Sequence, residues 1–246
     1  MKKLLLLQAR PEDPASDGEF NSVVKLGKIK SDEIHRVRME LAGIPEIDLN
    51  DYWGVFVGGT PFNVSDFEDT KSDAQKLAER DLYKLIDQII EKDFPFLGGC
   101  YAIGAMAERI EPGIVSKEKY SEPVGPTTIK LIYPAASDDP ITSGLPKEFR
   151  AFVGHKEAVQ RVPKGAVHLG RSDKCLIQMY RYKQNIYATQ FHPELDGEAL
   201  ELRINVYKHA GYFPPEDAED LINVVHQESV TVPEKILRRF VNRYRS

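Results

Sequence analysis

The chain has 246 residues, of which 41% are hydrophobic and 29% are charged, and its formal net charge is −5. This composition is typical of a globular protein that buries a sizeable core, and the acidic balance gives no reason to expect nucleic acid or an anionic membrane as a partner. The two cysteines, Cys100 and Cys175, cannot form a disulfide framework and fit a reducing cytoplasm.

The N-terminal apolar run is Leu4–Leu7, and Gln8 and Arg10 end it. A secretory signal peptide needs about 7–15 apolar residues, so this run predicts a short buried strand instead. No stretch of the sequence has the ~20 apolar residues that cross a bilayer. We therefore expect a cytoplasmic protein with no membrane partner.

Short apolar runs alternate with longer helical patterns in the first half of the chain, which predicts an α/β fold with a central, mostly parallel sheet. The clearest helical pattern covers residues 72–94, where Ser72 and Gln75 form a capping-box pattern. The other elements expected there are strands at Leu4–Leu7, Val37–Glu40, Asp51–Gly59 and 94–99, a polar loop at 11–20 and a helix over about 19–28.

After Ser116 the sequence is rich in short alternating runs, which predict later strands of the same sheet. From Asp196 onward the pattern is helical, with a break at Pro214-Pro215. Because no stretch has the composition of a linker, we predict one domain over residues 1–246, in which 197–246 form a helical C-terminal extension.

Cys100 lies in the segment FLGGCYAIGAMA, between a predicted strand and a helix of small residues. The pattern G-x-C-x-small is typical of a nucleophile elbow, a sharp turn whose neighbours at −2 and +2 must be small, here Gly98 and Ala102. Such a turn places the thiol at a helix N-terminus, which favours the thiolate. A buried cysteine that only fills space in the turn is the alternative interpretation.

The segment YATQFHPELD contains His192 and Glu194, two residues apart. In an extended chain these side chains point to the same side, so Glu194 can orient the imidazole of His192 to accept a proton from a thiol. A third segment, GVFVGG, ends a predicted strand with Gly58 and Gly59, whose N–H groups can stabilise an oxyanion. Alone, each pattern also fits an ordinary loop.

Together, the glycine strand, the cysteine elbow and QFHPE, 92 residues after Cys100, resemble the class I glutamine amidotransferases, in particular their stand-alone, GMP-synthase-like members. The resemblance covers nearly the whole chain and implies a flavodoxin-like three-layer fold. It also implies that Cys100, His192 and Glu194 form a catalytic triad that cleaves the side-chain amide of glutamine through a γ-glutamyl thioester and releases ammonia.

The same resemblance implies that the N–H groups of Gly59 and Tyr101 bind the oxyanion, with Gly58 beside them. It places His155, in the segment GHKEAV, near the mouth of the site. Cys175, by contrast, lies in an apolar run and is expected in the core.

The elbow departs from the family pattern C-x-G-[HQ]-Q. Ala102 replaces a glycine, and Gly104 stands where the family has a glutamine that helps to hold the substrate. A glutaminase-type enzyme with a modified pocket, a cysteine hydrolase of another γ-glutamyl or amide substrate, and a non-catalytic binding or regulatory protein on the same fold therefore all remain possible.

The sequence contains no GxxxxGK[ST] loop and no cysteine or histidine spacing typical of a metal site, so we expect no ATP chemistry, no cofactor and no metal. Residues 197–246 are too few for a nucleotide-activating domain. If ammonia is released for synthesis, we expect its acceptor to be a synthetase on a separate chain.

Overall fold

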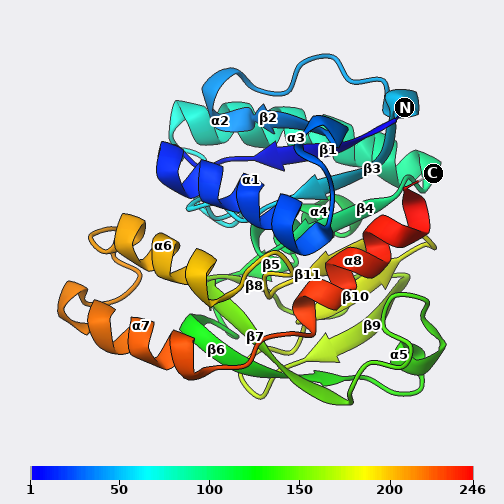
Figure 1. Ribbon diagram of the computed structural model, residues 1–246. Coiled ribbons are helices and arrows are strands. Elements are labelled where there is room, and N and C mark those ends of the chain that lie inside the picture. Colours follow the sequence, from blue (N-terminus) through cyan, green and yellow to red (C-terminus); the bar gives the residue numbers. More distant parts are fainter. Residues whose placement is uncertain (1, 246) are drawn as a thin grey trace.

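The computed structural model describes residues 2–245 and contains one large sheet with helices on both sides (Figure 1). The strands of the large sheet are β1 (Lys3–Gln8), β2 (Ile34–Arg38), β3 (Tyr52–Val57), β4 (Phe96–Gly99), β6 (Glu122–Leu131), β7 (Glu148–His155), β9 (Ala166–Arg171), β10 (Met179–Tyr182) and β11 (Ile186–Thr189). A small separate sheet pairs β5 (Val115–Ser116) with β8 (Ala158–Val159).

The helices are α1 (Asp13–Gly27), α2 (Met39–Ala42), α3 (Asp73–Lys92), α4 (Tyr101–Ile110), α5 (Ala135–Asp138), α6 (Gly197–Tyr207), α7 (Ala218–Gln227) and α8 (Pro233–Tyr244). Short 3₁₀ turns lie at Ser31–Glu33, Leu49–Asp51 and Pro215–Asp217. None of the helices within residues 2–245 combines the length and the apolarity that crossing a membrane requires.

The large sheet has the strand order β2-β1-β3-β4-β11-β10-β9-β6-β7. From β2 to β11 every neighbouring pair is parallel, and from β11 to β7 every pair is antiparallel. The parallel part is the centre of the α/β fold, so the predicted fold class is confirmed. The alternating segments after Ser116 form the antiparallel part.

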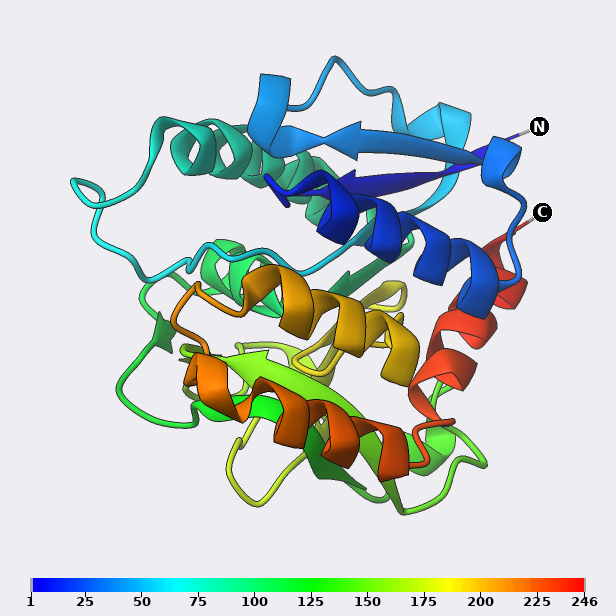
Figure 2. The same cartoon turned by 60° about the vertical axis from the view of Figure 1, so that its left-hand side comes forward.

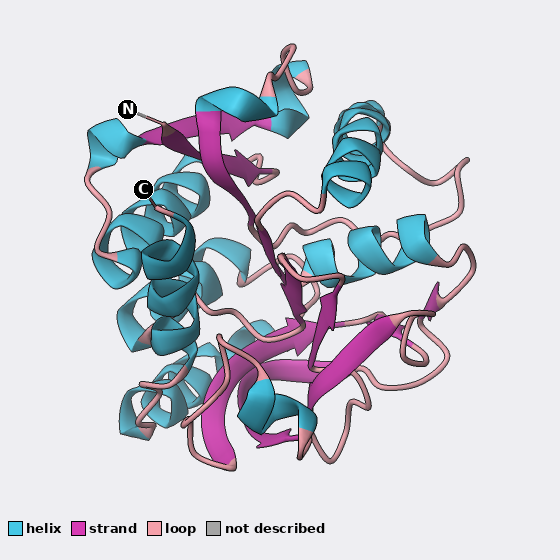
Figure 3. Ribbon diagram, turned by 90° about the vertical axis from the view of Figure 1, so that its right-hand side faces the viewer, coloured by secondary structure: helices cyan, strands magenta, loops and turns pink. Residues whose placement is uncertain are grey.

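The parallel strands are covered on both faces, as the edge-on view in Figure 3 shows. In β1, Leu5 and Leu7 belong to the core beneath α3 and α4, whereas Leu4 and Leu6 belong to the core beneath α1 and α8. A strand buried on both faces needs apolar residues at every position, which explains the unbroken leucine run.

The C-terminal helices pack directly on the rest of the chain (Figure 2). α6 lies along α1 and α7, and α7 contacts β6. Ile236, Leu237 and Phe240 of α8 are buried in the same core as Trp53 of β3. We therefore propose that the extension 197–246 and the preceding residues form a single domain, and this packing supports the proposal.

Two predicted boundaries were wrong. The segment expected to be a polar loop at 11–20 already belongs to α1, which begins at Asp13 because Pro14 suits a first helical turn and Ala15, Ser16 and Glu19 face the interior. β2 spans Ile34–Arg38 rather than Val37–Glu40, since Met39 begins the short helix α2. At α3, the N-cap is confirmed, with Ser72 accepting from the Gln75 N–H.

The three segments singled out by the sequence follow adjacent parallel strands. Gly58 and Gly59 follow β3, Cys100 follows β4, and His192 lies shortly after β11. Val57 pairs with Gly98, and Gly99 pairs with Thr189, so the strands end at the same edge of the sheet. Ligand sites of open α/β sheets lie at such carboxyl ends.

Candidate active site

Cys100 joins β4 to α4 in a strained turn, with φ 52° and ψ −102°. Its N–H donates to Thr189 O over 2.8 Å, which ties the turn to the end of β11. A Cβ on Gly98 would lie 2.6 Å from the Cβ of Ala102. The turn thus requires a glycine on one side and a small residue on the other, as an elbow does.

His192 and Glu194 form a buried pair. The Nδ1 atom of His192 lies 2.8 Å from Oε1 of Glu194, and the carboxylate side chain is fully buried. When Nδ1 carries the proton that it shares with Glu194, Nε2 is the nitrogen left for a reacting group. The two side chains therefore meet, but Pro193 and Glu194 lie in a turn and not in the extended chain that the sequence argument assumed.

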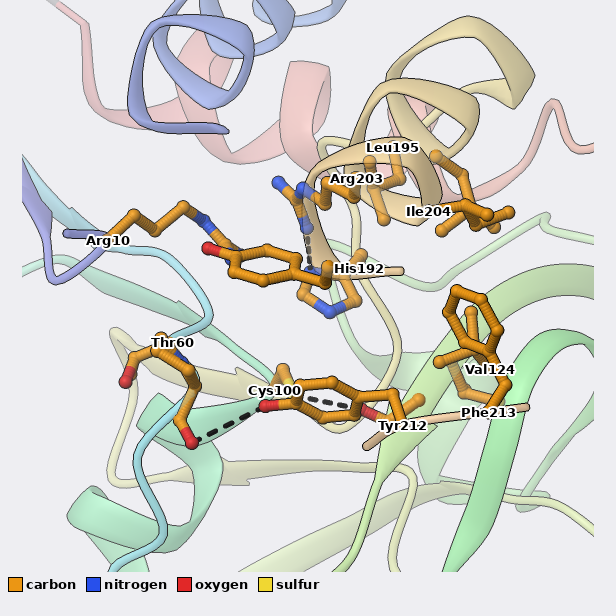
Figure 4. Close-up of a pocket in the computed structure, with 15 residues that line it drawn as sticks. Arg10, Thr60, Cys100, Val124, His192, Leu195, Arg203, Ile204, Tyr212 and Phe213 are labelled. Carbon is orange, nitrogen blue, oxygen red and sulfur yellow. Dashed lines mark hydrogen bonds between the residues drawn. The ribbon is translucent and has the colours of Figure 1, made fainter. Parts of the chain in front are cut away.

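Cys100 and His192 meet beside Gly59. A Cβ on Gly59 would lie 2.6 Å from Cε1 of His192 and 3.4 Å from Cβ of Cys100. Neither Gly58 nor Gly59 has a positive φ, so these glycines are needed for close approach and not for a turn conformation. Figure 4 shows Cys100 and His192 in one pocket, and both line it.

The charges of this pair favour the ionised forms. Burial lowers the pKa of His192, but the interactions with Glu194 and Cys100 outweigh burial and raise that pKa to about 9. Burial opposes ionisation of Glu194 as well, but His192 and Arg203 hold its pKa well below the usual range of a carboxyl group. The pair is thus a carboxylate beside an imidazole that binds a proton tightly.

Behind the pair lies a buried network of charges that the sequence analysis missed. Arg203 of α6 donates to Glu194 over 2.9 Å and to Glu19 over 3.2 Å. Arg10, just after β1, donates to Glu19 over 2.8 Å. The network residues Arg10, Glu19 and Arg203 are at most 6% exposed. No local pattern marks them, because they come from three elements far apart in the sequence.

The two glycines after β3 differ in their hydrogen bonds. The N–H of Gly58 donates to Leu7 O over 3.1 Å, so it serves the sheet and is not free for an oxyanion. Within residues 2–245, the N–H of Gly59 has no acceptor. Tyr101 is the first residue of α4, so its N–H has no intrahelical acceptor either. Of these three N–H groups, those of Gly59 and Tyr101 therefore lack a backbone acceptor within the described residues.

Cys100 stands between two pockets. The first, here called the apolar pocket, contains His192 and Arg203 (Figure 4). The second, here called the polar pocket, contains Gly104 and Glu157. Four residues line both pockets, namely Thr60, Cys100, Gly154 and Tyr212.

His155 lines the polar pocket, but its ring is held elsewhere. Nδ1 lies 2.8 Å from Glu157 O and Nε2 lies 3.1 Å from Glu122. Because both ring nitrogens are engaged, His155 is not available as a proton-transfer group. Its packing shapes the pocket wall.

Glu122, His155 and Cys175 form the one group of three potential metal ligands among residues 2–245, with ligand atoms within 4.8 Å of one another. In the structure, the group is a buried hydrogen-bonded cluster in which Glu122 also accepts from Thr127 and Ser172. Burial and the charge of Glu122 raise the pKa of the Cys175 thiol to about 12, so it stays protonated. Cys175 is fully buried, as the sequence predicted.

A family model described as "Glutamine amidotransferase class-I" matches residues 21–204. The chain belongs to this family. This finding confirms the family predicted from the glycine strand, the cysteine elbow and QFHPE, and it makes the protein an amidotransferase-family enzyme.

Curated relatives of this amidotransferase-family chain are glutamine-hydrolyzing GMP synthases. It is 35% identical over 118 residues to the GMP synthase of Thermosipho africanus, which is 48% of this chain and 22% of that protein. It is 32% identical over 132 residues to a GMP synthase subunit of Methanocaldococcus jannaschii, covering 52% of this chain and 66% of that one. The chain therefore matches about a fifth of the former protein.

Solved structures share the fold over nearly the full length of this amidotransferase-family chain. A glutamine amidotransferase from Thermotoga maritima matches with a TM-score of 0.75 at 21% identity, covering 99% of this chain and 98% of that one. A putative GMP synthase subunit from Thermoplasma acidophilum matches with a TM-score of 0.64 at 20% identity, covering 98% and 93%. At these identities the likeness shows the fold.

Proposed function

We propose that the chain is a cysteine-dependent amide hydrolase, in which Cys100, His192 and Glu194 cleave the side-chain amide of glutamine. The observation that carries the proposal is the His192–Glu194 pair of 2.8 Å, placed with the strained Cys100 turn around Gly59. A nucleophile, a base and a group that orients the base are the parts that acyl transfer needs.

The proposed reaction has two steps. In the first, His192 takes the proton of the Cys100 thiol, the sulfur attacks the γ-carbonyl carbon, and the N–H groups of Gly59 and Tyr101 stabilise the oxyanion. His192 then gives a proton to the leaving nitrogen. In the second step, water attacks the thioester and releases glutamate and the free thiol. Glu194 keeps the imidazole oriented throughout.

The polar pocket is the proposed site of the glutamyl group. Glu157 lies there, held by the N–H groups of Val64 and Ser65 over 2.7 and 2.8 Å. Burial raises the pKa of Glu157, and no Lys or Arg within residues 2–245 forms an ion pair with it, so a bound α-ammonium group would stabilise the carboxylate. Lys156 lines the same pocket and can meet the α-carboxylate.

Gly104 bears on the choice between substrates. A Cβ there would have only ordinary contacts, 3.5 Å from Val64 and Val115 and 3.7 Å from Glu157. The position thus has space for the Cβ of a side chain that the sequence does not supply. This observation favours, as the second candidate function, a cysteine hydrolase acting on another γ-glutamyl amide.

The relatives named as GMP synthase subunits support a further part of the proposal. If this chain releases ammonia, its acceptor is a synthetase on a separate chain. The proposed hydrolysis uses no cofactor, no metal and no nucleic acid. We also propose a cytoplasmic location without a membrane partner.

The test is glutamate release from glutamine by the purified protein, measured beside Cys100→Ala. Release by the wild type alone is the expected result. A reactive cysteine that ignores glutamine but forms a thioester with another γ-glutamyl amide would support the second candidate. A Cys100 that no glutamine-like electrophile labels would instead favour the non-catalytic alternative.

A further inference from the structure

The apolar pocket is larger than the release of ammonia requires. Its volume is about 70 Å³. A site for one molecule of the size of water or ammonia needs only about 10–15 Å³ on that measure. The pocket opens directly on Cys100 and His192, so its space belongs to the reacting groups (Figure 4).

The position of His192 decides which half of a substrate faces this pocket. The residue that protonates the leaving nitrogen must lie within hydrogen-bond reach of it. His192 lines the apolar pocket, whereas Gly104 and Glu157 line the polar pocket. With the glutamyl group in the polar pocket, any substituent on the leaving nitrogen enters the apolar one.

Much of the wall of the apolar pocket is hydrocarbon. Strands β6 and β7 contribute Val124 and Val153, and helix α6 contributes Leu200 and Ile204. The loops before and after α6 contribute Leu195 and Phe213. The two guanidinium groups at its edge, Arg10 and Arg203, are already paired with Glu19, and Arg203 also with Glu194. Paired charges and hydrocarbon walls favour an uncharged apolar group over a cation.

One side of the pocket comes from the segment after α6. Tyr212 lines the pocket with Cys100, and its hydroxyl donates to Pro61 O over 3.4 Å, while the Lys156 ammonium lies 4.7 Å from the centre of its ring. Tyr207, Tyr212 and Phe213 all follow residue 204, where the match to the family model ends. This side of the pocket is therefore an addition to the matched region.

We propose that this enzyme cleaves γ-glutamyl amides whose nitrogen carries an apolar alkyl or aryl group, with that group bound in the apolar pocket. This inference rests on the proposed function, because it uses the same Cys100, His192 and polar pocket. It narrows the substrate from any γ-carboxamide to the N-substituted ones.

The chemistry balances without a further reactant. The Cys100 sulfur bonds to the γ-carbonyl carbon, the C–N bond breaks, and the amine leaves with the proton that His192 donates. Water then breaks the thioester, which restores the thiol and yields glutamate. One amide and one water become one carboxylic acid and one apolar amine.

The experiment compares γ-glutamyl-n-butylamide with glutamine, with glutamate release as the readout for both. Because one methylene in an apolar pocket changes kcat/KM by roughly tenfold or more, we expect kcat/KM for the butylamide to exceed that for glutamine by at least tenfold. A γ-glutamyl amide of ethylenediamine, which carries a cation in the same place, should be cleaved more slowly than the butylamide.

Two variants test whether the apolar pocket causes the preference. Phe213→Ala opens the pocket and Val124→Phe fills it, and each should lower the butylamide-to-glutamine ratio of kcat/KM at least fivefold. Both residues are only partly buried, so the fold should tolerate the changes, and thermal unfolding checks this. Phe67→Ala is the matched control, since Phe67 is 79% exposed and lines neither pocket.

The outcomes separate the two proposals. Cleavage of glutamine with no preference for the butylamide, or a ratio that both variants leave unchanged, overturns this inference while the proposed hydrolase stands. A preference for glutamine would also overturn it, and would assign the pocket to ammonia on its way to a separate chain. Cleavage of neither substrate, with no labelling of Cys100 by the glutamine-like electrophile 6-diazo-5-oxonorleucine, overturns both.

Discussion

Arg203 in α6 donates a hydrogen bond of 2.9 Å to the Glu194 carboxylate, and the same nitrogen lies 3.2 Å from Glu19. One guanidinium group thus compensates two buried carboxylates, one of which orients His192. The residues that carry the proposed chemistry are therefore supported from behind by the C-terminal segment of the chain.

Replacing Arg203 should be costly. Arg203→Met removes one cationic partner from each of two buried carboxylates, so that Glu194 keeps only His192 and Glu19 keeps only Arg10 as a charged partner. Breaking a buried pair costs about 3–5 kcal/mol of unfolding free energy. Chemical denaturation measures the change. The control is Arg109→Met, which breaks the half-exposed pair with Asp87 and should cost less than about 1 kcal/mol. Equal effects of the two variants would contradict the assigned role of Arg203.

The strained turn at Cys100 makes a prediction about stability. At φ 52° and ψ −102° a side chain is strained by about 1–3 kcal/mol, and glycine is not. Cys100→Gly should therefore be more stable than Cys100→Ala by about 1 kcal/mol, although glycine is ordinarily the less stable choice. Thermal and chemical unfolding compare the two variants, both of which should lack turnover. A more stable alanine variant would show that the turn is unstrained.

Gly59 should tolerate no side chain. A Cβ there would lie 2.6 Å from His192 Cε1 and 3.0 Å from Arg10 Nη2, so Gly59→Ala must displace the imidazole. A shift of about 1 Å in a catalytic group costs roughly 100-fold in rate, and we expect kcat/KM to fall by about that factor. Gly197→Ala is the control, since its added Cβ would have its nearest contact at 3.6 Å, from Val225. An active Gly59→Ala enzyme would argue against His192 as the base.

The raised pKa of His192 predicts an alkaline limit to activity. The imidazolium form must protonate the leaving amine, so kcat/KM should fall above about pH 9, where His192 loses its proton. Glu194→Gln removes a charge that raises this pKa, so the alkaline limb should move to lower pH. The pH profile of amide cleavage measures both effects. Glu111→Gln, at an ion pair with Arg161 elsewhere on the chain, should leave the limb in place.

The same group links stability to pH. The pKa of His192 in the folded protein, about 9, is above its usual value of 6.5, so the folded state holds this proton more tightly than the unfolded one. The resulting stabilisation is complete below pH 6.5 and disappears as the pH rises through 9, a loss of about 3 kcal/mol. Unfolding curves at pH 6, 7.5 and 9 should show this decline in the wild type. A His192→Gln variant should show a smaller one.

The local features of the fold and the site could be read from the amino-acid sequence. Small neighbours around Cys100, the two-residue spacing of His192 and Glu194 and the leucine run of β1 reflect constraints that act within a few residues, so they can be read from the chain. The boundary of α1 could not, because Asp13, Pro14 and Ser16 also suit a loop, and only the burial of Ala15 and Glu19 against the sheet makes this segment a helix.

The surroundings of Cys100, His192 and Glu194 depend on how distant elements pack together. The order of the strands brings Gly59, Cys100 and His192 to one edge, and the docking of α6 on α1 brings Arg203 to Glu19 and Glu194. The same docking places Phe213 and Tyr212 in the wall of the apolar pocket. The periodicity of apolar residues tells which side of a helix is buried, but not which element packs against that side. The charge network and the pocket wall are assembled from distant segments, so they leave no local signal in the sequence.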